Sequence, residues 1–389
     1  MGNSGGVKRQ TKAAAFLGWL TIICLVVTCL EVASYIFLET FASSRVPYLI
    51  YRPSELLSRD VYEEYLKMRH PVLGWPSAKD EAPEDARARF VSASAESNGE
   101  CITAYGDSYV YGAEVPAEDA WSNFLTERIG CRIGNYGVSS YGIGQAFLRF
   151  QINKRDTASV TFLGIYPADF KRTVNQYRHF ITGNNRLAFK PRYYLDHEAL
   201  KLAPQPTIDY ESLSTFFESP DKFLQHESFL PDSALGPVSV RFPFTWRILN
   251  IGLREELHNW IARRPDWIAF VQPDHRSKAL EVTIAIASEF MRVCRNREKK
   301  CFFVFFPATN EYDYFRRSGN RAIQPLLDEL DRRSIPYLDL TRSFHTALGG
   351  DDICPMLTQP NKCRGHFNAT GNRMVSDHVY EYLADFGLP

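Results

Sequence analysis

An uncharged apolar run near the N-terminus is the feature that most constrains how this chain can fold. Residues 13–30 carry no charge, and the apolar stretch continues to Leu38. As a helix this run spans a bilayer, since about 20 apolar residues suffice. Lys8, Arg9 and Lys12 precede it, so the positive-inside rule predicts a cytoplasmic tail over 1–12, a transmembrane helix over 13–38 and the remainder across the membrane.

A cleaved signal peptide is the alternative, because it has the same basic start and apolar middle. The length of the run and the lack of a clear small-x-small cleavage site favour an uncleaved anchor. Glu31 lies in the outer third of the run. We expect its carboxylate to snorkel to the interface or to contact another helix.

Cysteine usage is consistent with export. Cys24 and Cys29 lie in the apolar run, and six cysteines follow in three neighbouring pairs: Cys101 and Cys131, Cys294 and Cys301, Cys354 and Cys363. An even number in an exported domain predicts disulfides, and we expect local pairing. The alternative is six reduced thiols. Neither CxxC nor HxxxH spacing occurs, so we expect no metal and no cofactor.

Beyond residue 100 the apolar pattern alternates between strands and helices, after a lead-in or stalk over 39–99 with one short helix over 58–70. Strands are predicted at 101–105, 131–138, 159–166, 301–306 and 336–340, and helices at 120–130, 142–154, 277–300, 320–334 and 369–387. This order predicts an α/β fold, a three-layer α/β/α sandwich around a mostly parallel five-stranded sheet. Sites in such sheets form at the carboxyl ends of strands. The 45 basic and 45 acidic residues leave no net charge, so no nucleic-acid partner is expected.

Residues from about 170 to 277 break this alternation and are rich in aromatic residues, proline and asparagine. We interpret them as an insertion in a domain that covers 100–389. The insertion either caps the site and shapes substrate binding, or is a structural addition without a role in binding.

Three short sequence motifs contain the candidate catalytic residues. "GDSYVYG" (106–112) follows the first strand, "NYGVSSYGIGQ" (135–145) follows the second, and "GHFNATGN" (365–372) precedes the last helix. Together, in this order, they resemble the SGNH or GDSL-type hydrolase superfamily, whose fold is flavodoxin-like. The resemblance covers roughly 100–170 and 280–389.

The resemblance implies roles for individual residues. Ser108 would be the nucleophile and one oxyanion donor through its own N–H, and His366 the general base. The second oxyanion donor would be the N–H of Ser140, which stands where the family usually has glycine, or that of Gly137. Asp107 would fix the turn by accepting backbone hydrogen bonds.

Two positions depart from the family pattern. Ala168 stands where an asparagine usually supplies a third oxyanion donor, while Asp169 is kept; Asn175 or Tyr166 could substitute. Cys363 stands where the family has the aspartate that orients the histidine. Either a carbonyl orients His366 in a Ser–His dyad, or another acid reaches it, the candidates being Asp351, Asp352 and Asp339.

These observations predict a membrane-anchored serine esterase acting outside the cytoplasm on ester groups, acetyl groups of carbohydrates being the first class to test. An O-acyltransferase that modifies a surface polysaccharide uses the same acyl-enzyme. The alternative from another class is a catalytically degenerate SGNH-like binding or scaffold protein, with partner proteins in a cell-envelope assembly.

Overall fold

A computed structural model describes residues 4–42, 49–52, 58–76, 89, 100–167, 169–182 and 187–385. Its centre is a five-stranded sheet with strand order β3-β2-β4-β8-β9, and every pair is parallel. The strands are β2 (Glu100–Tyr105), β3 (Arg132–Asn135), β4 (Val160–Ile165), β8 (Lys300–Phe305) and β9 (Tyr337–Asp339). The predicted fold class and all five strands are therefore confirmed.

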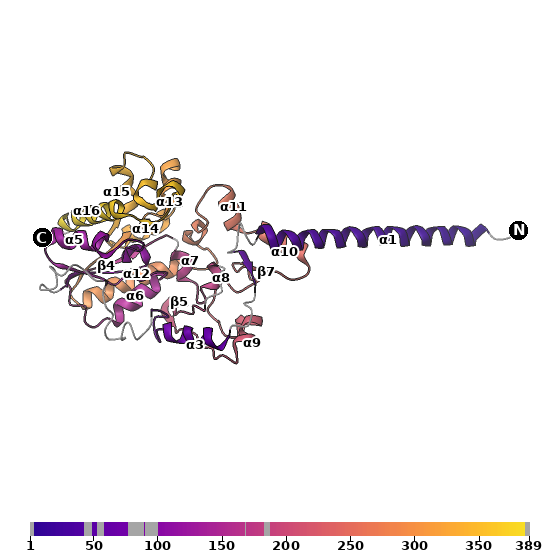
Figure 1. Ribbon diagram of the computed structural model, residues 1–389, viewed down its shortest axis with the longest axis horizontal. Helices are drawn as coiled ribbons and strands as arrows, with labels where there is room; N and C mark the ends of the chain where they lie inside the picture. The colour runs from indigo at the N-terminus through magenta and orange to yellow at the C-terminus, as the bar shows by residue number, and fades with distance from the viewer. Residues whose placement is uncertain are drawn as a thin grey trace.

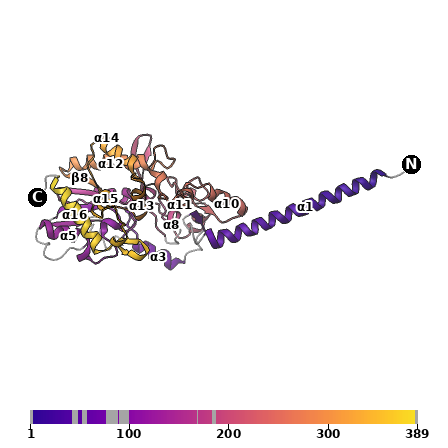
Figure 2. The same cartoon turned by 90° about the horizontal axis from the view of Figure 1, so that it is seen from above.

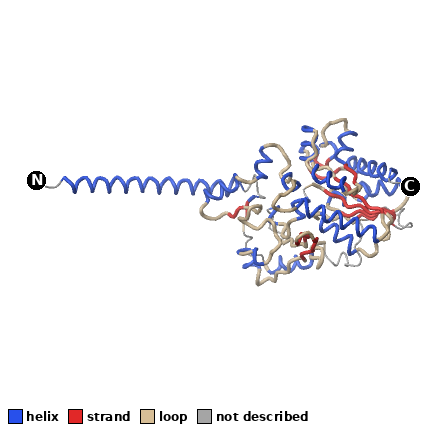
Figure 3. The backbone as a smooth tube through the Cα atoms, turned by 180° about the vertical axis from the view of Figure 1, so that it is seen from behind, coloured by secondary structure: helices blue, strands red, loops and turns tan. Residues whose placement is uncertain are grey.

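Helices cover both faces of this sheet (Figures 1 and 3). Successive side chains of a strand point to opposite faces, so Phe302 and Val304 join one apolar core while Phe303 and Phe305 join the other. The first core packs against α5 (Trp121–Ile129), α13 (Thr309–Ser318), α15 (Leu340–Ala347) and α16 (Ala369–Asp385). The second packs against α6 (Ile143–Ile152), α12 (Ala279–Asn296) and α14 (Gln324–Arg332).

The strand order places β2 between its successor in the chain, β3, and β4. The chain therefore crosses the sheet in one direction from β2 to β3 and in the opposite direction from β3 to β4. The carboxyl ends of β2 and β4 flank this reversal, which is where open α/β sheets form their sites. Ser108 follows β2 at this point.

The predicted insertion contains short elements rather than a second large sheet. They are α7 (Asp169–Thr173), α8 (His179–Thr182), β5 (Arg192–Asp196), β6 (Ala199–Ala203), α9 (Leu213–Glu218), β7 (Val238–Ser239), α10 (Phe244–Gly252) and α11 (Glu255–Ile261). Strands β5 and β6 form an antiparallel hairpin. Aromatic residues of the insertion, such as Phe216 and Trp267, are buried in the same core as α6 and α12, so the insertion is packed into the domain.

Parts of the lead-in also join the domain. Helix α3 (Arg59–Met68) lies where the sequence predicted a short helix, and the Tyr62 hydroxyl donates to the Ile208 carbonyl of the insertion at 2.8 Å. Strand β1 (Ile50–Tyr51) pairs with β7. Residues 43–48, 53–57, 77–88 and 90–99 lie outside the described residues.

The apolar N-terminal run forms one long helix, α1 (Ser4–Phe37), which continues into a π-helical turn, η1 (Leu38–Ala42). Residues Ala15–Thr40 are long and apolar enough to cross a membrane, with mean hydropathy 2.2. The helix projects away from the rest of the protein (Figure 2). This is the candidate anchor that the sequence predicted.

The remaining elements are short. They are α4 (Ser108–Tyr111), β10 (Leu357–Gln359), β11 (Arg364–Phe367) and the 3₁₀ turns η4 (Ala117–Asp119), η5 (Pro220–Lys222), η6 (Ile268–Val271), η7 (Cys354–Met356) and η8 (Pro360–Lys362). The six cysteines outside α1 form the three expected local disulfides, Cys101–Cys131, Cys294–Cys301 and Cys354–Cys363.

Candidate active site

Ser108 is the first residue of α4, directly after β2. Gly106 makes this turn possible, because a Cβ there would lie 2.2 Å from Val110 Cγ2. The Asp107 carboxylate caps α4 by accepting from the Tyr109 N–H at 2.8 Å. The Ser108 N–H lies in the first turn of this helix, where no carbonyl one turn earlier can accept it. The Ser108 hydroxyl therefore lies at the edge of the sheet, beside a backbone N–H that the helix itself does not use.

His366 contacts this serine and comes from the C-terminal part of the chain. It lies in β11, which pairs with β10 in a small antiparallel ribbon just before α16. The imidazole Nε2 is 2.8 Å from Ser108 Oγ. The structure thus brings together the two residues singled out in the sequence, although they are 258 positions apart.

The acid facing His366 is Glu114, which the sequence analysis did not single out. Its Oε1 lies 2.8 Å from His366 Nδ1. A carboxylate only accepts hydrogen bonds, so Nδ1 carries the proton and Nε2 is left to accept from the serine. The three side chains form one line: hydroxyl, imidazole, carboxylate.

Glu114 is held in place although its side chain is 42% exposed. Its second oxygen, Oε2, accepts from the His366 N–H at 3.2 Å and from the Thr358 hydroxyl. Partial burial raises the pKa of Glu114, but the hydrogen bonds from Thr358 and His366 outweigh it and leave the pKa below its ordinary value. These hydrogen bonds therefore favour the ionised form of the carboxylate.

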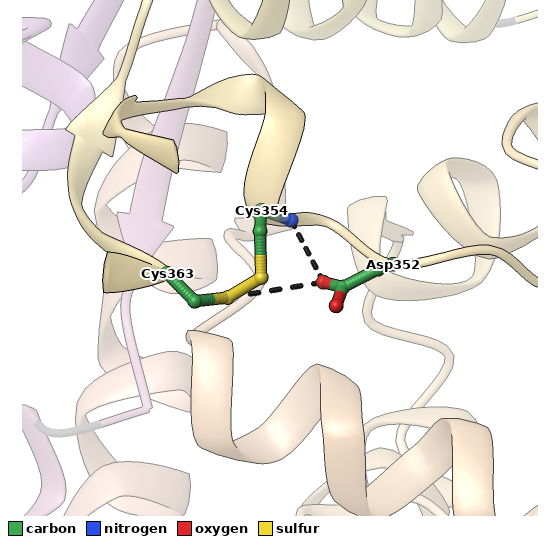
Figure 4. Close-up of side chains that lie close together, drawn as sticks. All are labelled: Asp352, Cys354 and Cys363. Carbon is green, nitrogen blue, oxygen red and sulfur yellow. Dashed lines mark hydrogen bonds between the residues drawn. A yellow bond between two sulfur atoms is a disulfide. The ribbon is translucent and has the colours of Figure 1, made fainter. Parts of the chain in front are cut away.

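The acids that we expected to orient His366 lie elsewhere. Asp352 accepts from the Cys354 N–H at 2.8 Å and so supports the disulfide loop (Figure 4). Asp339 caps α15 and pairs with Arg321, and the Asp351 carbonyl accepts from the Tyr312 hydroxyl. The predictions for Asp352, Asp351 and Asp339 are replaced by Glu114, and the arrangement is not a Ser–His dyad.

Cys363, at the position of the family's aspartate, is bonded to Cys354 beside Asp352 (Figure 4). Asp352, Cys354 and Cys363 come close enough to suggest a metal cluster. A disulfide offers no thiolate, however, and a thiolate is what binds zinc. The group is better understood as a clamp on the loop that carries His366.

A buried charge cluster lies behind the serine turn. Arg172 Nη1 is 2.6 Å from Asp169 Oδ1 and 3.3 Å from Asp107 Oδ2, and it also donates to the Tyr141 carbonyl at 3.0 Å. Burial raises the pKa of both carboxyl groups, for Asp169 helped by its neighbour Asp107, while Arg172 opposes the shift. Asp107 faces Arg172 rather than His366, which supports its expected role in fixing the turn.

The turn after β3 contains the expected oxyanion donors. The Val138 N–H donates to the Gly106 carbonyl at 3.0 Å, which ties this turn to the serine loop. Ser140 has a φ of +70°, a conformation that favours glycine, the usual residue of the family there. The Gly137 N–H, in contrast, donates to the Asn135 side chain at 3.1 Å. Of the two candidates, Ser140 is the one the structure favours.

The structure also shows where the two candidates for a third oxyanion donor, Asn175 and Tyr166, lie. Asn175 is fully buried, and its amide donates to the Tyr177 carbonyl and to Glu227, so it is not available to Ser108. Tyr166 stacks on Tyr109 with ring centroids 4.3 Å apart, and Tyr109 lies 4.8 Å from the His366 ring. These two tyrosines line the side of the site on which His366 lies. Ala168 lies outside the described residues.

The sheet order, the serine at the end of β2 and the histidine before the last helix define the class that the sequence resembled, an SGNH-like α/β fold. No family model matches the chain, and no curated protein matches it. The site geometry and the three blocks are therefore the main guides to function.

Several solved structures are similar to the chain at low identity. An acetylxylan esterase from Geobacillus stearothermophilus is 10% identical with a TM-score of 0.38, over 75% of this chain and 96% of that chain. A protein assigned to the G-D-S-L family of lipolytic proteins, from Desulfitobacterium hafniense DCB-2, is 10% identical with a TM-score of 0.33, over 72% and 96%. An alpha/beta hydrolase from the metagenome of Lake Arreo, Spain, is 11% identical with a TM-score of 0.37, over 72% and 94%. At these TM-scores the likeness carries no argument about function.

Proposed function

We propose that this chain is a serine esterase of SGNH type. Ser108 is the nucleophile, His366 the general base and Glu114 the acid that orients the imidazole. One observation carries the proposal: Ser108 Oγ, His366 and Glu114 form a continuous line with two 2.8 Å contacts. A hydroxyl next to an oriented base is the arrangement that turns serine into a nucleophile.

The proposed reaction has two steps. Ser108 Oγ attacks the ester carbonyl while its proton passes to His366 Nε2, and Glu114 stabilises the imidazolium through Nδ1–H. The tetrahedral intermediate expels the alcohol, which takes the proton from His366, and an acyl-serine remains. Water then attacks the acyl-serine with His366 as base, which releases the acid and restores the serine.

The N–H groups of Ser108 and Ser140 would stabilise the oxyanion of both tetrahedral intermediates. The positive φ of Ser140 and the tie between Val138 and Gly106 support this, since donors that are already in position need no rearrangement during the reaction. Tyr166, beside Tyr109, bounds the same side of the site as the imidazole.

Acetyl esters of carbohydrates are the substrate class that we propose first, following the resemblance noted in the sequence. The site supports a small acyl group, since Ser108 is only 8% exposed and the aromatic rings of Tyr109 and Tyr166 stand beside His366. The alcohol side would face outward past the exposed carboxylate of Glu114.

We propose that α1 holds this domain at a membrane, outside the cytoplasm. The three disulfides support an oxidising compartment, and the basic residues before the apolar run support a cytoplasmic N-terminus. Fusion of a periplasmic-only reporter enzyme after Asp385 tests this orientation. Reporter activity is expected there, and its absence with activity of a cytoplasmic-only reporter contradicts it.

A fluorophosphonate probe tests the nucleophile. The full chain in detergent should be labelled, and Ser108→Ala should abolish labelling while Ser139→Ala, in the neighbouring turn, should not. His366→Ala should slow labelling strongly, because the serine loses its base. A folded wild-type protein that no such probe labels would favour the degenerate binding or scaffold protein.

Acetate release separates an esterase from an O-acyltransferase, since both share the acyl-serine. Acetate should form from an acetylated oligosaccharide without any added acceptor. Turnover that depends on an oligosaccharide acceptor, with little free acetate, would replace the esterase by the transferase.

A further inference from the structure

An exposed apolar surface lies on the helices α10 and α11 of the insertion and on the residues that flank α10, which contacts the anchor helix. We call it the α10–α11 face. Its residues are Phe242, Trp246, Leu249, Leu253, Trp260 and Ile261, each 55–74% exposed. Isolated apolar residues are common on protein surfaces, but a group of this size on adjoining helices marks a binding surface.

Helix α10 is fixed to α1 by specific contacts. The Glu31 carboxylate accepts from the N–H groups of Phe244 and Thr245, the first two residues of α10. Ser34 Oγ lies 3.1 Å from Thr245 Oγ1, and the rings of Tyr35 and Phe244 are 5.0 Å apart. Figures 1 and 2 show α10 beside the end of α1 where the helix meets the domain. The α10 part of this face is therefore held close to the apolar helix, and α11 is in contact with α10.

These contacts occur at a defined height along α1. A hydrocarbon core of about 30 Å takes about 20 helical residues. Counted from Ala15, where the candidate span begins, 20 residues end at Ser34. With the inner boundary at Ala15, Glu31 and Ser34 lie at the outer boundary of the hydrocarbon, within the candidate span Ala15–Thr40, and α10 lies there with them.

The composition of the surface suits this boundary. Trp246 and Trp260 are of the residue type that is enriched at membrane interfaces, where the indole ring meets both acyl chains and headgroups. Arg263 and Arg264 follow Ile261 after one intervening residue, Ala262, and are exposed. Such side chains reach from an apolar surface to the headgroups. A protein partner would require no such match to the height of the membrane boundary.

The same membrane boundary explains why a glutamate, Glu31, lies in the apolar run. A carboxylate at the edge of the bilayer is costly unless it is paired or hydrogen-bonded. The N-terminus of α10 offers two unsatisfied N–H groups and the positive end of the helix dipole. The glutamate therefore docks α10 onto the anchor.

We propose that the α10–α11 face is immersed in the outer leaflet of the membrane that α1 spans, so that lipid is its partner. This inference rests on α1 being the membrane anchor and is independent of the esterase proposal. The domain then has two membrane contacts, the anchor and this face, and lies against the lipid surface.

Lipid quenching in nanodiscs tests the proposal on the full chain. Cys24 and Cys29 are first replaced by serine, and bimane is attached at Leu249→Cys, Trp260→Cys, Val27→Cys or Glu381→Cys. Replacing the lipid by its brominated analogue should cause a loss of fluorescence at positions 249 and 260 and at Val27, inside α1. Glu381 is 65% exposed on α16 near the opposite end of the molecule, and its label should lose none.

The outcomes separate the inference from its premise. Quenching at Val27 but not at positions 249 and 260 overturns the inference and leaves the anchor intact. Labels at 249 and 260 that neither brominated lipid nor aqueous iodide quenches indicate a covering protein, either a second copy or a partner, and also overturn it. No quenching at Val27 removes the anchor and the inference together.

Discussion

Glu114 shows how a single residue completes the proposed site. Gly112 and Glu114 both have positive φ, 71° and 68°, and this double turn returns the chain after α4 toward Ser108. Arg89, from the lead-in, donates to the carbonyls of Tyr111, Gly112 and Val115 and holds the turn from outside. Serine and acid thus come from one loop of a few residues.

Glu114→Gln should lower kcat/KM for an acetyl ester by about 10²–10⁴-fold, because the amide keeps the shape but neither holds the required tautomer nor stabilises the imidazolium. KM should change little. Steady-state kinetics in detergent check this, with Glu118→Gln, an exposed acid four residues on, as the matched control. An equally large loss in Asp352→Asn, with Glu114→Gln active, would return the role to the acid expected from the sequence.

The pH dependence of stability should also report on Glu114. Its folded-state pKa is below the ordinary 4.5 because hydrogen bonds from Thr358 and His366 outweigh burial. A depressed carboxyl pKa stabilises the fold above about pH 4.5, and this stabilisation is lost as the pH falls through the folded-state pKa. The difference in unfolding midpoint between wild type and Glu114→Gln should therefore be larger at pH 7 than at pH 3; a larger difference at pH 3 contradicts the assignment.

Arg172→Met should destabilise the protein by about 3 kcal/mol or more, because it leaves two buried carboxyl groups without the cation that contacts both of them. The Arg172 side chain is 16% exposed and those of Asp107 and Asp169 at most 2%. Denaturant unfolding measures the free-energy change. Adding Asp169→Asn should recover part of it, and a further loss in the double variant would show that Asp169 is stabilised by other means.

At the scale of elements, the site depends on how firmly the ribbon of β10 and β11 is held. Thr358 in β10 donates to Glu114, and His366 in β11 contacts both Glu114 and Ser108. The Cys354–Cys363 disulfide closes the segment that includes β10, immediately before β11. Both strands are short, so this covalent link supplies order that two strands alone provide weakly.

Two disulfides offer a matched comparison. Cys354–Cys363 and Cys294–Cys301 close segments with sequence separations of 9 and 7, so removing either by a double serine substitution should cost a similar ~2–3 kcal/mol. Only the former should lower kcat/KM, since the latter links the end of α12 to the start of β8, away from the carboxyl edge of the sheet. Thermal unfolding and ester hydrolysis check the two effects. Equal losses of activity would mean that the histidine loop does not need its clamp.

For the whole molecule, the sheet, its helices and the disulfides could be predicted because apolar periodicity and local cysteine spacing are properties of short segments. Ser108 and His366 could be predicted from blocks of adjacent residues. Glu114 could not, because its role depends on a left-handed turn and on a ribbon that arrives about 250 residues later. Asp352 stood closer to His366 in sequence, but its carboxylate is used by the Cys354 N–H.

Glu31→Leu should loosen the domain from its anchor without changing the chemistry. Two N–H groups of α10 would lose their acceptor, and a hydrogen bond to a charged group contributes about 1.5–3 kcal/mol. Limited proteolysis of the protein in nanodiscs should then cut residues 241–264 faster than in wild type. Turnover of a small soluble ester should be unchanged. Unchanged proteolysis would mean that the other contacts of α1 suffice.

The residues of the proposed site lie far apart along the chain, and this determines when the site can form during synthesis. Ser108 and Glu114 leave the ribosome together, and His366 follows 258 residues after the serine. In the proposed mechanism the hydroxyl until then has an acid nearby but no base, and we expect it to be inert. In our assignment a half-made chain crossing a membrane cannot hydrolyse anything on the far side; the activity begins only when the histidine ribbon closes onto a finished sheet.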